Sequence, residues 1–130
     1  MVKENQSSNE KIGKLQKLQL DIIAHTNFNN LNGRKIKRLL IKHRQLWRAV
    51  IIQGNEFLLL RELENDHSMA DTIYILARKG SETQLEELVN ENFEADNVQW
   101  VRDEMALVML RNQENFLEQN LPPVLSVWWD

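Results

Sequence analysis

The sequence predicts an α/β (or α+β) domain in which an N-terminal pair of helices packs on a small three-stranded, mostly parallel sheet with crossover helices. In the first half of the chain, apolar residues recur at the spacing of amphipathic helices. In the second half, short β-rich runs alternate with stretches of helical pattern. Strand–helix–strand order over such a length is typical of parallel strands joined by right-handed crossovers.

The size and composition are those of one soluble globular domain. A chain of 130 residues can bury a real core, and its 42% hydrophobic and 27% charged residues are ordinary proportions. We expect a disordered tail over residues 1–8 and a single domain over residues 9–130. The polar N-terminus and the absence of an apolar run of about 20 residues predict a cytoplasmic protein with no membrane contact. The chain has no cysteine, which excludes disulfides, thiolate zinc sites and cysteine nucleophiles.

The net charge of -3 conceals two halves of opposite sign. Residues 1–55 carry eleven Lys and Arg against three acids, a net charge of +8. Residues 56–130 carry five Lys and Arg against sixteen acids, a net charge of -11. We therefore divide the domain into a basic helical half over residues 9–52 and an acidic, βαβαβ-like half over residues 56–130. Such a division can indicate contact with a nucleic acid, a membrane or an acidic partner surface.

Residues 7–25 have the pattern of the first helix. Ser7 and Glu10 have the spacing of a capping box, in which each side chain accepts the free backbone N–H of the other residue. The apolar positions recur at helical spacing: Ile12, Leu15, Leu18, Ile22 and Ile23. The Asn-rich stretch that follows, up to Gly33, predicts a loop.

The segment Gly33–Arg48 predicts a second, strongly basic helix whose apolar face continues to Ile51. At about 100° per residue, one face collects apolar side chains: Ile36, Leu39, Leu40, Leu46, Trp47, Val50 and Ile51. The rest of the circumference carries seven cations and no acid: Arg34, Lys35, Lys37, Arg38, Lys42, Arg44 and Arg48. Ile41 alone lies clearly on the polar side, and His43 falls at the middle of the apolar face, where we expect a hydrogen-bonded core histidine.

Two interpretations remain open for residues 49–62. Gly54 and Asn55 have the composition of a two-residue hairpin turn between strands. Gly54 can equally end the basic helix as a left-handed cap, with Asn55 capping a new helix over roughly residues 56–65. We favour the second interpretation because the apolar face of the helix extends to Ile51.

The acidic half contains the predicted strands. Residues 72–77, 97–101 and 124–129 are short β-rich runs bounded by turn signals. Ser81 and Gln84 have capping-box spacing at the start of a helix between the first two strands. Residues 102–119 predict one or two further helices before the last strand.

The loop that contains Lys79 and Gly80 lies between a predicted strand and a helix N-terminus, a place where α/β proteins often bind phosphate. Three glutamates in the first two turns of that helix would repel an anion, and the loop matches neither a P-loop nor G-x-G-x-x-G. An ordinary capped turn is therefore the favoured interpretation.

No catalytic, metal or cofactor site is predicted. The histidines, His25, His43 and His67, have neither metal-ligand spacing nor an H-E-x-x-H pattern. Asp66, His67 and Ser68 are adjacent, and because adjacent side chains rarely point at one another we interpret them as a polar turn.

The C-terminal Trp128 and Trp129 cannot both face the same side of a strand. An exposed tryptophan there would be a plausible partner anchor. We favour burial of both, since a small sheet with helices on both faces needs large side chains.

The charge division favours a non-catalytic protein-interaction or regulatory module that acts through complementary charged surfaces, by binding another protein or by self-association. Its interaction surface would be the seven cations of the basic helix. The alternative is a nucleic-acid binder that uses the same cations, whose phosphate contacts would depend strongly on salt. Against this alternative, the nine-residue loop before the helix is too long for a helix-turn-helix, and the basic face has no aromatic side chain for base stacking. An enzyme is the third hypothesis.

Overall fold

The computed structural model describes residues 12–53, 60–66, 68–101 and 123–130. In chain order its elements are α2 (Lys14–Ala24), β1 (Asn27–Phe28), β2 (Leu31–Asn32), α3 (Gly33–Lys42), the 3-10 turn η1 (Arg44–Leu46), β3 (Trp47–Gln53), α4 (Leu60–Glu64), β4 (Thr72–Ala77), α5 (Glu82–Asn92), β5 (Asn97–Trp100) and β6 (Val124–Trp128).

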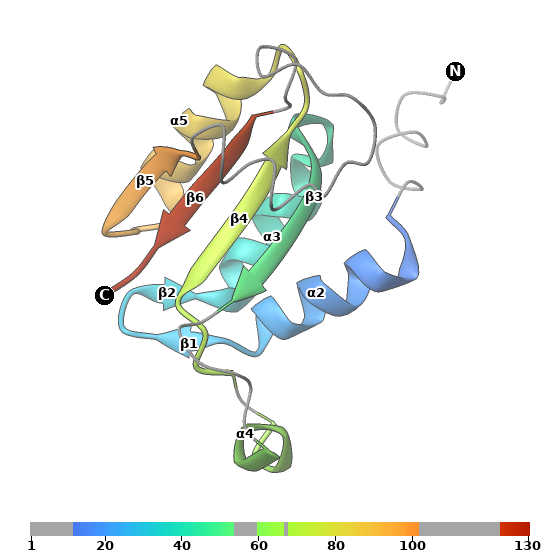
Figure 1. Cartoon of the computed structure of the whole chain (residues 1–130), viewed down its shortest axis with the longest axis vertical. Coiled ribbons are helices and arrows are strands. Elements are labelled where there is room, and N and C mark those ends of the chain that lie inside the picture. The colour runs from blue at the N-terminus through green and yellow to red at the C-terminus, as the bar shows by residue number, and fades with distance from the viewer. Residues whose placement is uncertain (1–11, 54–59, 67, 102–122) are drawn as a thin grey trace.

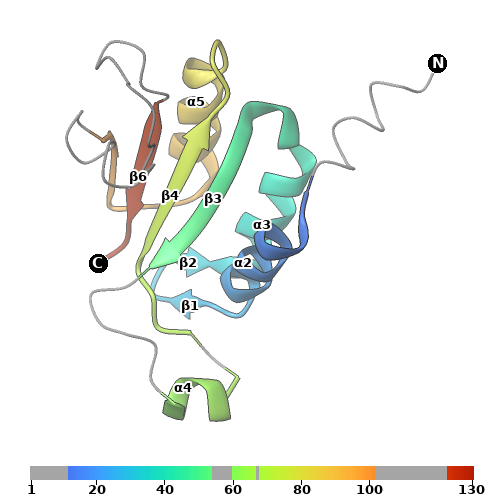
Figure 2. The ribbon, with the colours of Figure 1, turned by 45° about the vertical axis from the view of Figure 1, so that its right-hand side comes forward.

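The fold is α+β, built on an antiparallel four-stranded sheet with the order β3-β4-β6-β5 (Figure 1). A separate two-stranded antiparallel ribbon, β1–β2, joins α2 to α3. Helices α3 and α5 lie against one face of the sheet, and α2 lies along the edge formed by β3 (Figures 1 and 2). The edge strands of this sheet are β3 and β5, and α2 contacts β3.

The prediction of a three-stranded, mostly parallel sheet is wrong. Strands do occupy residues 72–77, 97–100 and 124–128, close to the predicted ranges. However, β4 and β5 each pair with β6 in the antiparallel sense, so β4 and β5 run in the same direction without being neighbours. The connection through α5 places β5 two positions away from β4 in the sheet. The last strand of the chain, β6, lies between them. Patterns of single segments carry no information about such an insertion.

The predicted basic helix is confirmed only as far as Lys42. His43 is the C-cap of α3, and the following residues form η1 and then β3. In β3 the side chains of Trp47, Val50 and Ile52 are buried, and those between them are exposed. Trp47 and Val50 fit the apolar face of a helix, and they also fit the buried face of a strand. Pairing with β4 makes this segment a strand.

Other expectations have mixed outcomes. His43 is half-buried at the end of α3, not within a core face. The helix expected near residues 56–65 exists as α4. The hairpin interpretation is right that a strand, β3, precedes Gly54. It is wrong about the strand that pairs with β3, which is β4. The side chain of Ser81 makes no cap hydrogen bond, so the expected box with Gln84 does not form. The expected tail, the Ser7–Glu10 box, the Gly54–Asn55 turn and the helices of residues 102–119 lie outside the described residues.

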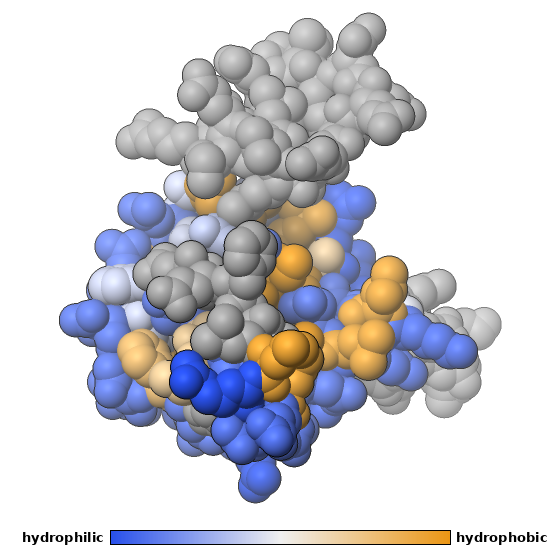
Figure 3. Space-filling view, turned by 60° about the horizontal axis from the view of Figure 1, so that its bottom comes forward, coloured by the Kyte–Doolittle hydropathy of each residue, from blue (hydrophilic) through white to orange (hydrophobic). Residues whose placement is uncertain are grey.

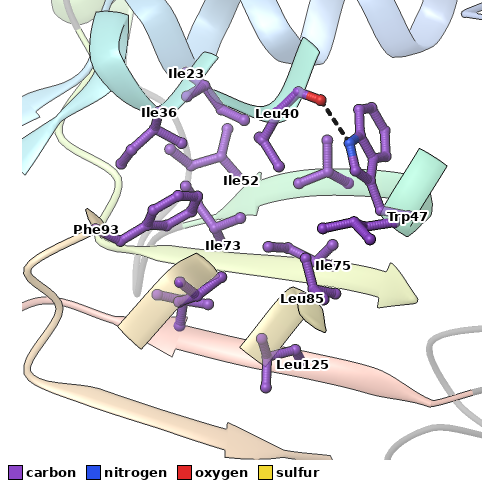
Figure 4. Packing of buried hydrophobic residues seen from close by; sticks show 14 of the residues in the cluster. Ile23, Ile36, Leu40, Trp47, Ile52, Ile73, Ile75, Leu85, Phe93 and Leu125 are labelled. Carbon is purple, nitrogen blue, oxygen red and sulfur yellow. Dashed lines mark hydrogen bonds between the residues drawn. The ribbon is translucent and has the colours of Figure 1, made fainter. Parts of the chain in front are cut away.

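The core lies between the sheet and the helices. Figure 4 shows side chains of α2, α3, α5 and three strands converging there, among them Ile23, Leu40, Ile73 and Leu125. The indole N–H of buried Trp47 donates to the backbone oxygen of Leu40 at 2.8 Å. Large aromatic side chains can be buried at this depth because their polar atom finds a partner.

Gly33 permits the close approach of α2 and α3. Its backbone N–H donates to Thr26 O at 3.0 Å. A Cβ at this position would lie 1.8 Å from Ile23 O and 2.5 Å from Thr26 O, which are rigid backbone atoms. Glycine is thus required by the space between the helices.

We expect Gly33→Ala to lower the free energy of unfolding by at least about 2 kcal/mol, because the added methyl group overpacks the contact. Chemical denaturation measures the change. Gly13→Ala is the matched control, since a Cβ at Gly13 meets nothing within 4 Å. Because Gly13 is the N-cap of α2, where Gly is preferred over Ala, this change should cost about 0.5–1 kcal/mol. Equal stabilities of the two variants would contradict the steric account.

Two glutamines of α2 pair with the open backbone edge of β3. Gln16 Nε2 donates to Val50 O at 2.8 Å, and Val50 N donates to Gln16 Oε1 at 2.9 Å. Ile52 N donates to Gln19 Oε1 at 2.9 Å. The side-chain amides therefore satisfy groups that a further strand would otherwise pair with.

We expect Gln16→Ala to destabilise the fold by roughly 1–3 kcal/mol, because it leaves the N–H and C=O of Val50 without these partners. The double variant with Gln19→Ala should also aggregate faster, since it uncovers the sheet edge. Denaturation and light scattering measure the two effects. Gln84→Ala, on an exposed position of α5, should change neither.

Candidate interaction surface

The seven predicted cations do not lie on one surface. Five of them are on α3, Arg44 is in η1, and Arg48 is on β3. Because the chain leaves the helix at Lys42, the last two side chains are no longer related to the others by helical spacing. Their contacts therefore differ from one residue to the next.

Two cations of α3 face acids of the same chain. Lys37 Nζ lies 2.8 Å from Asp21 Oδ1 on α2, and the hydrogen bond and charge of Lys37 lower the pKa of Asp21. Lys35 Nζ lies 4.0 Å from Glu94 Oε2, just beyond the end of α5. These side chains tie α3 to the helices on either side of it.

Arg44 belongs to the core and not to the surface. Its side chain is buried, and its guanidinium stacks over the Trp47 ring at 4.2 Å from the ring centroid. It also donates to the backbone oxygen of Trp47. Burial is the main cause that lowers the pKa of Arg44, and the charge of Arg78 adds to it. A partner therefore has little access to this cation.

We expect Arg44→Ala to lower the stability by roughly 1–3 kcal/mol, because it removes a stacked cation and a charged hydrogen bond at a buried place. Thermal unfolding with circular dichroism measures the effect. Arg48→Ala is the control, since Arg48 is exposed, and its stability should stay within about 0.5 kcal/mol of the parent.

The remaining cations of α3 line up on its exposed side. Arg34, Arg38 and Lys42 are all exposed and follow one another every four residues, about 6 Å apart along the axis. Beside them is a shallow hollow lined by Ala24, Arg34, Lys37, Arg38 and Ile41. We call these five residues and Lys42 the α3 surface.

Ile41 is the apolar centre of this surface. Its side chain is 38% exposed on a helix that otherwise shows charge to the solvent. The sequence already indicates that Ile41 is exposed, because it is the one apolar residue clearly on the polar side of the predicted helix. The contributions of Ala24, Asp21 and Glu94 could not be found in that way, because they come from other elements.

The two terminal tryptophans have different environments. Trp129 is fully buried, and its indole N–H donates to Phe93 O at 3.1 Å. Trp128 is 38% exposed, so the expectation that both are buried is wrong. Trp128 pairs with Thr72 and Asn97 on the face of the sheet that points away from α3. As a partner anchor it would therefore belong to a surface other than the α3 surface.

The other candidate sites hold their own partners. The backbone N–H of Gly80 donates to Glu82 Oε1 at 2.9 Å, so a carboxylate occupies the donor that a phosphate would use. His25 Nδ1 lies 2.9 Å from Asp21 O, and its Nε2 lies 3.4 Å from Asp66 Oδ2. His67 lies outside the described residues. Among the residues that are described, no three His, Asp or Glu side chains gather as metal ligands.

No family model, curated protein or solved structure matches the chain. In the described part of the chain, no helix combines the length and the apolar composition of a membrane span. The functional assignment therefore rests on the chain's own residues.

Proposed function

We propose that the protein is a non-catalytic interaction module that binds an acidic protein partner on the α3 surface. The observation that carries this proposal is the exposed Ile41 beside a line of three exposed cations, Arg34, Arg38 and Lys42. An apolar side chain of a partner can pack on Ile41 while its carboxylates meet the cations. Charge complementarity of this kind raises association rates and selects partners.

A nucleic acid is the second candidate, because cations about 6 Å apart along a helix can follow a phosphate backbone. Two observations favour the protein partner. Exposed Trp128, the described tryptophan best placed for stacking, follows core residue Val127 in β6, so its side chain lies on the face of the sheet that points away from the core. Glu94 lies 4.0 Å from Lys35, so acid borders the α3 surface on its α5 side.

Amide chemical shifts of the full chain test the proposal in titrations with four probes. The probes are a peptide of alternating Glu and Leu, a peptide of Glu alone, duplex DNA and single-stranded RNA. We expect the Glu–Leu peptide to bind most tightly and to shift amides of α3, because only it offers both carboxylates and apolar side chains. Its affinity should fall at least about tenfold when Arg34, Arg38 and Lys42 are all replaced by Glu.

Two variants separate the two parts of the surface. Ile41→Ser should reduce the preference for the Glu–Leu peptide over the Glu peptide, and Lys79→Glu, an exposed cation outside the surface, should change nothing. Steeply salt-dependent binding of DNA or RNA that is lost in the triple Glu variant would assign the surface to nucleic acid instead. Binding of none of the probes would remove the assignment.

A further inference from the structure

A second exposed surface is formed by α2 and α4, on a different side of the molecule from the α3 surface. Leu15 on α2 is 81% exposed and Leu60 on α4 is 84% exposed, and Leu18 and Leu63 are both more than half exposed. Figure 3 shows apolar side chains gathered on this face. Single exposed leucines are ordinary, but a gathered apolar patch indicates an interface.

Helix α4 stands away from the body of the domain (Figures 1 and 2), and none of its five residues is buried. Contacts at its C-terminal end connect it to the end of α2. His25 Nε2 lies 3.4 Å from Asp66 Oδ2, and Ser68 N donates to His25 O at 3.2 Å. The leucines of α4 thus lie on the same side of the molecule as α2, and they add nothing to the core of their own chain.

The two helices of this face carry opposite charges. On α2, Lys14 is exposed one helical turn from Leu18, and Lys17, which precedes Leu18, is also exposed. Between Leu60 and Asp66 there are three acids and one arginine. A face with a cationic part and an acidic part is complementary to a second copy of itself after a two-fold rotation, because each part then meets its opposite.

We infer that the α2–α4 face, formed by Leu15, Leu18, Leu60 and Leu63 with Lys14, Lys17 and Glu64, is a two-fold interface between two copies of this chain. In the dimer, α4 of each copy packs on α2 of the other. The leucines are withdrawn from water, and the lysines of α2 meet the acids of α4 in both halves of the interface. This inference is independent of the proposed function, because it uses a different surface.

The test is the molar mass of the full chain in solution, measured by sedimentation equilibrium from about 1 to 200 μM, a range that covers micromolar dissociation constants. We expect a concentration-dependent dimer. Leu18→Glu and Leu63→Glu should each weaken it at least tenfold, a 1.4 kcal/mol change, because each places a charge in the apolar contact. Since both side chains are exposed, neither variant should lower the stability of the monomer. Ile41→Glu, on the α3 surface, is the matched control and should leave the dimer intact.

Charge reversal tests the reciprocal contact. Lys14→Glu with Lys17→Glu makes both helices acidic. Glu62→Lys with Glu64→Lys leaves one acid against three cations between Leu60 and Asp66, so that α4 becomes basic like α2. Each reversed chain should be monomeric alone, because like charges then meet in both halves of the interface. A mixture of the two should form heterodimers, since opposite charges meet again. Dimers of either reversed chain, or homodimers alone in the mixture, would contradict the crossed arrangement of α2 and α4.

A parent chain that stays monomeric over the whole series would overturn the inference. Binding of that monomer to phosphatidylserine–phosphatidylcholine vesicles would then assign the face to a membrane surface. Oligomers larger than a dimer would also overturn it, because a two-fold interface closes on itself.

Discussion

The backbone edge of β3 is paired with Gln16 and Gln19 of α2, and the positions of both exposed surfaces depend on that pairing. A bare edge strand would bind other strands, so the sheet needs some cover at this side. The glutamine amides supply it with the geometry of a neighbouring strand, donating to Val50 O and accepting from Val50 N. Once α2 is held there, Leu20 and Ile23 face the core, whereas Leu15 and Leu18 remain on the outside.

The position of α2 also determines that of α3. The two helices approach until only a glycine fits at position 33. Lys37 then lies against Asp21, while Lys35 at the same end of the helix lies near Glu94. The cationic segment is therefore partly neutralised by neighbours from both halves of the chain. What remains for a partner is the outer line of Arg34, Arg38 and Lys42, with Ile41 beside it.

The two surfaces illustrate different uses of exposed residues in a small domain. On the α3 surface, charged side chains predominate and Ile41 is the one apolar side chain among the exposed residues. On the α2–α4 face, leucines predominate, and lysines of α2 and acids of α4 lie near them.

Periodicity and composition were informative wherever one segment decides its own structure. The helix of residues 33–42, the strand of residues 72–77 and the exposed side of Ile41 all follow from local pattern. Residues 47–51 were assigned to the wrong element because Trp47 and Val50 fit a helix and a strand equally well. Residues 47–51 form a strand because they pair with β4, a segment more than twenty residues away in the sequence. Likewise, no local pattern shows that β6 fills the gap between β4 and β5.

By itself, the sequence determined the amphipathic helices, three of the strands, the division of charge between the two halves and the absence of thiol chemistry. The tertiary structure decided which cations stay available, since Arg44 stacks on Trp47 and Lys37 meets Asp21. It also decided the direction of the strands and the exposure of Leu15 and Leu18. The physical reason is the same in each case. Strand pairing, ion pairing and burial bring together residues that are far apart in the chain. The free energy of each such contact depends on both segments and cannot be read from either one alone.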